Sequence, residues 1–298
     1  MKIVQKRKIW FLLSGLLIIT SIVSLYFWKL NWGIDFVGGS LLELEFAEGA
    51  PDTNEFREYL KAYEPGIGTP TILETEENRV ILRMKETDKM WYDKLTKDLE
   101  KDYKAKEYSF ESIGPTIGNE LRRRALWSIV GISICIIFFL SYAFRKVPHP
   151  LSSWQFGVTA VTALVHDVLI VVGLFSILGH FRGVEVDTLF ATALLTTLGF
   201  SVHDTIVIFD RIRENLLEYS GEDFEEIANK SVNQALVRSL NTSFTTFLVL
   251  LALLLFGGTT IHYLALALIC GVIIGTYSSD FIAVPLLVLW HRFAEKRR

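Results

Sequence analysis

Cysteine is scarce in this chain of 298 residues, and several long stretches carry no charge at all. Both cysteines, Cys135 and Cys270, lie within apolar runs and form no Cys-x-x-Cys pair, so core packing is their expected role. A net charge of −3 leaves no basic face large enough to hold phosphates, which gives no case for nucleic-acid binding. Hydrophobic residues make up 51% of the chain and the mean hydropathy is +0.36, which is too apolar for a soluble enzyme of this length. We therefore expect a membrane protein.

Six apolar runs reach the length of about 20 residues that a membrane-spanning helix needs. In chain order, the expected spans cover residues 9–28, 125–144, 154–178, 188–209, 240–256 and 262–289. The last two come from one stretch, 239–279, which lacks Asp, Glu, Lys and Arg and is interrupted by Gly257-Gly258-Thr259-Thr260. No small-residue cleavage site follows the first run, so we expect it to remain as an uncleaved span rather than to serve as a signal peptide.

Lysine and arginine are distributed unevenly between the two sides that these spans define. Fourteen of them fall on one side, at both termini and after the second and fourth spans: Lys2, Lys6, Arg7, Lys8, Arg145, Lys146, Arg211, Arg213, Lys230, Arg238, Arg292, Lys296, Arg297 and Arg298. The two short connections on the other side contain only Arg182. Because short cytoplasmic segments collect basic residues, we expect both termini in the cytoplasm. Arg122, Arg123 and Arg124 fall on the outer side, but they follow a long translocated segment, where this rule loses force.

The segment between the first two spans differs chemically from the rest of the chain. Residues 31–121 contain 20 acidic and 11 basic residues, against 13 acidic and 19 basic elsewhere. Residue patterns predict strands at 41–46, 69–75, 79–84 and 107–113 and helices at 51–63 and 87–103. This βαββαβ order indicates a ferredoxin-like α+β domain outside the cytoplasm, with a folded spacer as the alternative. Gly38-Gly39 indicates a tight turn more than a ligand site, and the segment has no nucleophile, metal cluster or phosphate loop.

Charged residues inside the spans are the main candidates for function, because they are costly there and tend to line ion paths. Asp204 lies 16 residues into the fourth span, which is about 24 Å into a core of about 30 Å. Arg238 opens the fifth span at a similar depth, and its long side chain can reach inward. We expect the two to meet, so that movement of Arg238 switches Asp204 between protonated and ionised forms as a proton relay. A static pair that fixes helix packing is the alternative.

Three further residues are weaker candidates for this relay. Asp167 lies in the middle of the third span beside His166, and we expect it either to hydrogen-bond helices together or to be a second relay member. His203 precedes Asp204, and Asp280 lies at a similar depth in the sixth span, where we favour the interpretation that it reaches out to the cytoplasmic interface. Two His-Asp pairs raise the question of a metal site. Neighbouring side chains on a helix diverge by about 100° and no His-Glu-x-x-His motif is present, so we expect no metal.

Six motifs follow one another from the first span to the last: 33–39 (GIDFVGG), 112–118 (SIGPTIG), 163–167 (ALVHD), 204–215 (DTIVIFDRIREN), 238–243 (RSLNTS) and 275–279 (GTYSS). As a set they resemble the motifs of the SecF proteins of the SecD/SecF family, which belong to bacterial Sec protein export. Two residues depart from the family pattern: His203 stands where Asn is usual, and Asp280 stands where an apolar residue is expected. We expect His203 to touch the relay and alter its pH response, and Asp280 to compete for Arg238.

The resemblance implies a six-span fold of the RND superfamily in the bacterial cytoplasmic (inner) membrane. It implies a proton-driven subunit that works with SecD to pull secreted protein out of the SecYEG channel, with Asp204 and Arg238 as the proton-coupling residues. The implied partners are SecD, SecYEG, an unfolded secretory polypeptide and the lipid membrane, with YidC and YajC as further candidates. No cofactor, metal or enzyme activity is implied.

We expect four segments: 1–30 with the first span, 31–121 as the outer domain, 122–291 with spans two to six, and 292–298 as a basic cytoplasmic tail. Only one six-span repeat is present, so the chain is expected to work as one half of a pair, for which the close-packing glycines Gly271 and Gly275 offer a helix seam. A passive scaffold of the translocon or insertase and half of an RND-type small-molecule exporter are the alternatives. An intramembrane enzyme is least favoured, because no nucleophile or metal motif is present.

Overall fold

The computed structural model describes residues 1–47, 49–74, 78–147, 151–219 and 221–296. The chain divides into two compact units: a helical unit, Met1–Asn31 with Trp127–Arg298, and a sheet unit, Trp32–Leu126. Thr75 of the predicted hairpin and Arg297 and Arg298 of the predicted basic tail lie outside the described residues.

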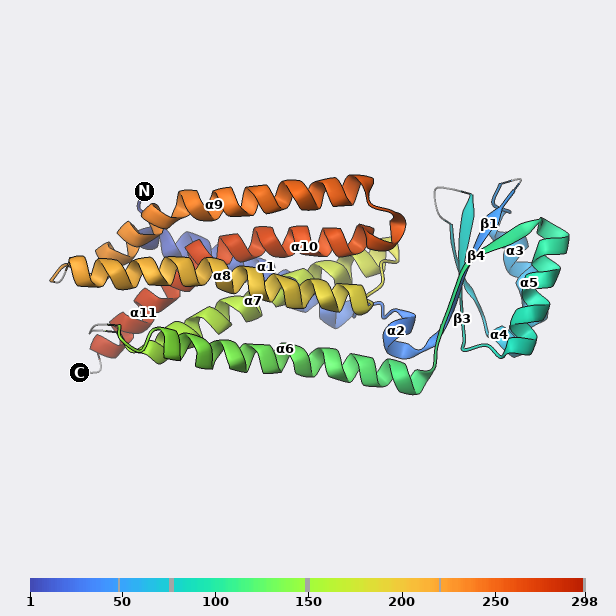
Figure 1. Ribbon diagram of the computed structural model, residues 1–298, viewed down its shortest axis with the longest axis horizontal. Coiled ribbons are helices and arrows are strands. Elements are labelled where there is room, and N and C mark those ends of the chain that lie inside the picture. Colours follow the sequence, from blue (N-terminus) through green and yellow to red (C-terminus); the bar gives the residue numbers. More distant parts are fainter. Residues whose placement is uncertain (48, 75–77, 148–150, 220, 297–298) are drawn as a thin grey trace. The chain divides into compact units, whose positions relative to one another are not determined.

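Six helical stretches are long and apolar enough to cross a membrane, as the sequence predicts. The helices are α1 (Arg7–Phe27), α6 (Pro115–Ala143), α7 (Ser153–Arg182), α8 (Thr188–Glu218), α9 (Phe224–Phe256), α10 (Thr259–Ser278) and α11 (Val284–Glu295), with a short 3-10 helix at Val4–Lys6 and a π-helix at Ser279–Ala283 that joins α10 to α11. Within the helical unit, both chain termini and the connection between α8 and α9 lie at one end (Figure 1). The six helices therefore pass back and forth along the unit.

Several helices run well past the predicted spans. α9 begins at Phe224 rather than at residue 240, α8 continues to Glu218, and α6 begins at Pro115 rather than at residue 125. The predicted bounds stop at charged residues, but a charge ends only the apolar run and leaves the backbone hydrogen bonding of a helix intact. The actual helix starts follow local chemistry: Asp187 caps α8 by accepting from the Phe190 N–H at 2.7 Å, and proline opens α6.

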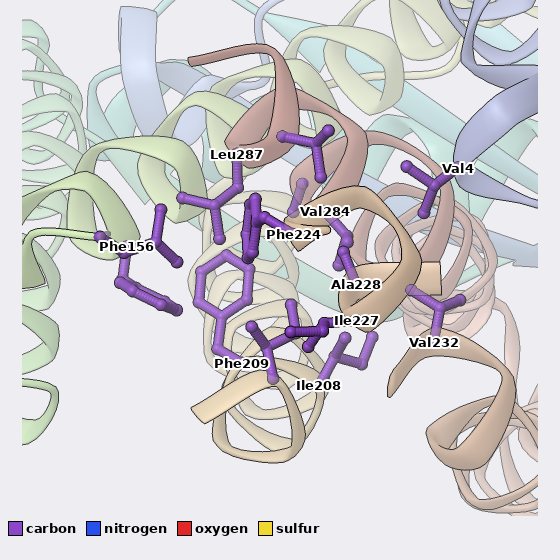
Figure 2. Packing of buried hydrophobic residues seen from close by; sticks show 14 of the residues in the cluster. Val4, Phe156, Ile208, Phe209, Phe224, Ile227, Ala228, Val232, Val284 and Leu287 are labelled. Atoms are coloured by element: carbon purple, nitrogen blue, oxygen red, sulfur yellow. The ribbon is translucent and has the colours of Figure 1, made fainter. Parts of the chain in front are cut away.

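The main apolar core of the helical unit lies near the connection between α8 and α9. Figure 2 shows side chains of α7, α8, α9 and α11 facing one another there, among them Phe156, Phe209 and Phe224. The rings of Phe156 and Phe209 meet edge to face with centroids 5.0 Å apart, an arrangement that aromatic quadrupoles favour. Beside this core, Glu225 pairs with Arg7 at 3.0 Å and also with Arg292, so one buried carboxylate ties the starts of α1 and α9 to α11.

The sheet unit contains β1 (Gly39–Phe46), α3 (Thr53–Leu60), a 3-10 turn (Lys61–Tyr63), α4 (Glu64–Ile67), β2 (Thr71–Glu74), β3 (Arg79–Met84), α5 (Lys89–Tyr103) and β4 (Ala105–Ile113). The sheet order is β2-β3-β1-β4, and every pair of neighbouring strands is antiparallel. Helix α3 and the 3-10 turn that follows it are bound to α5 by tyrosine hydroxyls: Tyr59 of α3 donates to Asp102 at 2.9 Å and Tyr63 of the turn donates to Asp98 at 2.6 Å. The predicted strands and helices are thus present, with shifted ends.

The glycine pair at the start of β1 occupies a backbone geometry that only glycine tolerates well. Gly38 has φ +80° and Gly39 has φ +141°, and a Cβ at Gly38 would lie 2.6 Å from Cα of Pro115. The chain here leaves the short helix α2 (Ile34–Val37), which the sequence analysis missed, and passes directly against the start of α6. The pair therefore marks a close backbone approach as well as a turn.

Candidate functional site

Helices α8 and α10 pack along a seam of small residues. Thr197 and Ser201 are buried on α8, and a Cβ at Gly271 would lie 2.2 Å from Thr197 Oγ1. A Cβ at Gly275 would lie 2.9 Å from Cβ of Ser201. Glycine at both positions lets the two backbones approach closely, as in other membrane helix pairs. The expectation that these glycines offer a seam to a partner protein is therefore wrong, because α8 of the same chain already fills it.

A fully bonded carboxylate lies beside this seam. Asp167 on α7 is only 1% exposed, and its Oδ2 accepts hydrogen bonds from the hydroxyls of Ser201 on α8 and Ser278 on α10, both at 2.7 Å. Its Oδ1 lies 2.9 Å from Nδ1 of His166, whose Nε2 lies 3.0 Å from the hydroxyl of Ser14 on α1. We call these five residues the Asp167 network. It joins four helices, which is the hydrogen-bonding role expected of Asp167; a relay role for it stays a prediction.

Asp204 on α8 is buried but incompletely bonded. It is 3% exposed, and its Oδ2 has no hydrogen-bond partner in the described part of the chain. The hydroxyls of Ser239 on α9 and Thr276 on α10 lie beside the carboxyl, yet Ser239 Oγ also lacks a partner. Thr276 shares a short hydrogen bond of 2.5 Å with Ser243 on α9. The Asp204 carboxyl thus lies where three helices meet, with an unused acceptor and an unused hydroxyl next to it.

Asp280 does not reach the interface, contrary to the interpretation that the sequence favoured. It is 0% exposed and lies in the π-helix Ser279–Ala283, which packs against α1, α7 and α8. Ser279, the residue before it, has its Oγ 2.8 Å from Thr205 Oγ1 on α8. The wide turn of the π-helix, often found at functional sites, places this segment inside the bundle, so Asp280 is turned away from the surrounding medium. Its carboxyl interacts electrostatically with that of Asp204, and we call these two residues the Asp204–Asp280 pair.

The expected contact between Asp204 and Arg238 is not formed. Arg238 is exposed, and within the described ranges it makes no ion pair. Arg238 and Ser239 are neighbours on α9, and a helix rotates by about 100° per residue, so Ser239 faces the bundle while Arg238 faces out. The same rotation separates His203 from Asp204: His203 is exposed and makes no hydrogen bond among the residues described. The charge of His203 nevertheless acts on the Asp204 carboxyl, so an influence of His203 on the relay stays a prediction. Competition of Asp280 for Arg238 is not seen among the described residues, where Arg238 makes no ion pair.

The described residues contain no group of three or more His, Cys, Asp or Glu side chains placed to hold a metal ion. The imidazole of His166 and the carboxylate of Asp167 bond to each other. In the second pair the side chains diverge, because His203 is exposed and Asp204 is buried. What the site offers instead is carboxyl groups at membrane depth that can gain or lose a proton.

On the helix of Asp204 itself, Thr197, Ser201 and Thr205 are polar positions that the sequence identifies, and Ser201 and Thr205 do lie beside the acids. The sequence analysis missed Ser239, Ser243 and Thr276 on the neighbouring helices, because serine and threonine are ordinary in membrane helices. A signal was available in their spacing: Ser239 and Ser243 lie four residues apart and so share one face of α9. The π-helix had no signal that periodicity can detect, because its single extra residue per turn is set by packing.

Family models match two regions of the chain. The C-terminal model of protein export membrane protein SecD/SecF matches residues 92–293, and the SecD/SecF GG motif matches residues 24–50, which include Gly38 and Gly39. The first match covers the candidate site, and the second covers the close approach before β1.

Similar proteins and structures agree with these matches. The chain is 44% identical to protein translocase subunit SecF of Thermobaculum terrenum, over 97% of this chain and 93% of that protein. It is 40% identical to protein translocase subunit SecF of Anaerolinea thermophila, over 97% of this chain and 94% of that one. The crystal structure of SecDF from Thermus thermophilus, a translocon-associated membrane protein, matches with a TM-score of 0.84 and 32% identity, over 99% of this chain but only 38% of that chain. The chain therefore belongs to the SecD/SecF family of protein export membrane proteins, among its SecF members.

Proposed function

We propose that this chain is a SecF subunit of the bacterial Sec protein translocase, which works with SecD to drive the late part of protein export across the cytoplasmic membrane with the proton gradient. Family membership and SecF relatives that match almost end to end support the translocase assignment. The single observation that carries the use of protons is Asp204, a buried carboxyl with an unbonded oxygen inside an apolar helix bundle.

Arg238 is the partner through which proton binding at Asp204 would drive movement. In the present arrangement Ser239 occupies the inward face of α9, so Arg238 reaches Asp204 only after α9 turns or slides relative to α8 and α10. A carboxylate that has lost its proton attracts the guanidinium, and a protonated one releases it. Proton entry and exit at Asp204 would thereby be coupled to the position of α9.

The remaining assignments follow from the same proposal. The chain spans about two fifths of the SecDF chain, and SecD is the partner we propose for the rest. SecYEG, an unfolded secretory polypeptide, and YidC and YajC are further proposed partners. The antiparallel order β2-β3-β1-β4 with α3 and α5 supports a ferredoxin-like fold for the sheet unit, and the six helices support the RND type. The proposed segment bounds stay at 1–30, 31–121, 122–291 and 292–298.

We also propose that both termini lie in the cytoplasm and the sheet unit outside. The fourteen basic residues on one side of the spans support this orientation. Single cysteines at Lys89, in the sheet unit, and Glu222, between α8 and α9, test it, because both positions are exposed. An impermeant thiol reagent applied to intact cells should label position 89 and leave position 222 unlabelled; the reverse pattern would exclude the orientation.

The deciding experiment compares Asp204→Asn with wild type in vesicles that contain the assembled translocase. Asn keeps the shape of the side chain but cannot ionise, so export per complex should lose its response to an imposed proton gradient while assembly with SecD is unchanged. Asp210→Asn is the matched control, since Asp210 lies on the same helix but pairs with Arg213 at a partly exposed site. A passive scaffold would behave differently: export would not respond to the gradient even in wild type. A wild-type gradient response in Asp204→Asn complexes would remove Asp204 from the relay.

A further inference from the structure

Asp280 is an acid in a place where membrane proteins rarely keep one. Ser278, Ser279 and Asp280 are consecutive residues and are all 0% exposed, although a helix normally turns one of three neighbours outward. The π-helix that begins at Ser279 packs against α1, α7 and α8 as well as the helices it joins, and all of its residues except Phe281 are buried. The carboxyl of Asp280 is therefore held in the interior by the backbone itself.

Neither oxygen of Asp280 has a hydrogen-bond partner, and no basic group pairs with it, within the described ranges of the chain. An ionised carboxylate without partners inside a membrane protein is strongly unfavourable. In this arrangement Asp280 therefore carries its proton, and its O–H group lacks an acceptor. The Oδ2 atom of Asp204 also has no hydrogen-bond partner in the described structure, although the hydroxyl of Ser239 lies beside that carboxyl.

The two acids are brought together by their chain neighbours. Thr205 follows Asp204, Ser279 precedes Asp280, and the hydroxyls of Thr205 and Ser279 are 2.8 Å apart. Ser279 also donates to the carbonyl of Ser201 at 3.2 Å, which holds the start of the π-helix against α8. The carboxyls of Asp204 and Asp280 interact electrostatically, and Asp204 is the one charged group that acts in this way on Asp280 among the residues described.

The other titratable groups on the surrounding helices are bonded elsewhere or exposed: Arg7 pairs with Glu225, His166 and Asp167 bond to each other, Tyr277 bonds to Ser14 and to the carbonyl of Trp10, His291 lies beside Phe224 and Glu295, and His203 and Arg238 are exposed. None of these groups takes the proton of Asp280 in the present arrangement.

We propose that Asp280 is a second proton-holding residue, which shares one proton with Asp204 so that the two acids act as a single unit. In the shared state one of the two acids holds the proton, so an O–H bond broken on Asp280 is matched by one formed on Asp204 and the pair keeps a charge of −1. A second proton from water neutralises the pair, and its release restores the shared state. The inference rests on the proposed use of protons by this chain.

Titration of the two carboxyls by difference infrared spectroscopy tests this inference on the full chain in membrane vesicles, without any transport assay. Shared protons make the two acids titrate as a coupled pair, so Asp280→Asn should shift the midpoint of the Asp204 carboxyl band by about one pH unit or more. The reciprocal variant Asp204→Asn should shift the band of Asp280 by a similar amount, which keeps the test decisive if one variant fails to fold. Asp210→Asn, on the same helix as Asp204, should shift neither band.

Independent titration would overturn the inference: each variant would then remove its own band and leave the other at its wild-type midpoint. This failure is distinct from failure of the proposed function, which shows as a wild-type complex that exports protein without any response to a proton gradient. If wild type responds to the gradient and the two bands titrate independently, Asp204 works alone and only the role of Asp280 is lost.

Discussion

Two groups of acids lie in the same helical unit, at similar burial, and differ in their hydrogen bonding. In the Asp167 network both carboxylate oxygens are used, and the donors come from α7, α8 and α10. In the Asp204–Asp280 pair, three of the four carboxyl oxygens have no partner in the described structure. Buried polar groups stabilise a fold only when they are satisfied. Burial alone therefore does not distinguish these acids; we expect the acids whose carboxyl oxygens lack a hydrogen-bond partner to be the ones that exchange a proton.

The seam between α8 and α10 serves both groups. Ser201, which touches Gly275, donates to Asp167, and Thr205, one turn further along α8, bonds to Ser279 beside Asp280. A change in the packing of these two helices therefore reaches the bonded and the unbonded acids together. Because both groups of acids lie on the same pair of helices, variants of each group can be compared directly for their effect on stability.

The largest effect on stability is expected for Asp167→Ala. The variant leaves Ser201, Ser278 and His166 without their acceptor, and each stranded buried group costs about 1–3 kcal/mol, so a loss of roughly 3 kcal/mol in the free energy of unfolding is expected. Asp167→Asn retains one acceptor oxygen and should lose less. Denaturant unfolding of the full chain in detergent measures both. Equal stability of Asp167→Ala and wild type would remove the distinction between the two groups of acids.

A smaller loss is expected for Gly271→Ala. The added Cβ would meet Thr197 Oγ1 at 2.2 Å, so α8 and α10 must separate, and such overpacking costs about 1–3 kcal/mol. Gly199→Ala on α8 is the control, because nothing lies within 4 Å of its added Cβ and alanine favours a helix. Thermal unfolding should show a lower midpoint for the first variant and an unchanged or higher one for the second. A higher unfolding midpoint for Gly271→Ala would mean that α8 and α10 have room for the added methyl group.

The opposite sign is expected for Asp280→Leu. Removal of a buried carboxyl that has no hydrogen-bond partner in the described structure removes its desolvation cost. At a pH where Asp204 is itself protonated and needs no shared proton, this should raise the free energy of unfolding by about 1 kcal/mol. The same unfolding measurement applies, with Asp167→Leu as the matched variant that should lose stability. A marked loss for Asp280→Leu would reveal bonds that hold Asp280 as firmly as Asp167 is held.

The smallest effect concerns an acid at the surface of the sheet unit. Tyr59→Phe removes the hydrogen bond to Asp102, which is partly open to water, so a loss of about 1 kcal/mol or less is expected. Tyr108→Phe is the control, since its hydroxyl is exposed and its ring lies over Arg79. If Tyr59→Phe lost more of the free energy of unfolding than Asp167→Ala, the expectation that buried hydrogen bonds contribute more than exposed ones would be wrong.

The same tyrosine gives the sheet unit a pH dependence. Burial, followed by hydrogen bonds to Tyr63 and Asp102, raises the pKa of Tyr59 above its usual value of about 10. Because the folded pKa is the higher one, this stabilisation is fully present below about pH 10 and is lost as the pH rises towards the folded pKa. Tyrosinate absorbance against pH should show a late-titrating fraction that decreases in Tyr59→Phe. If all tyrosines of the wild-type chain titrated together near pH 10, the hydrogen bond between Tyr59 and Asp102 would be contradicted.

The spans and the strands could be predicted from composition and periodicity, because burial in lipid or against a sheet imposes apolar runs and alternation directly on the residues. Helix ends were predicted less well. Helix α9 begins 16 residues before the predicted span, because backbone hydrogen bonds do not depend on apolar side chains. Asp204 was found because a charge at membrane depth is rare. The hydroxyls that neighbouring helices place beside it, those of Ser239 and Thr276, could not be predicted, because serine and threonine carry no comparable signal.

By itself, the sequence determined that this chain crosses a membrane six times, carries an α+β unit after its first span and keeps acids in its interior. Only the tertiary structure decided which acids are bonded. One residue along a helix rotates a side chain by about 100°, so Ser239 rather than Arg238 faces Asp204, and one π-turn places Asp280 inside rather than at the interface. Such choices depend on how neighbouring helices pack around each residue, and no single run of the sequence contains that information.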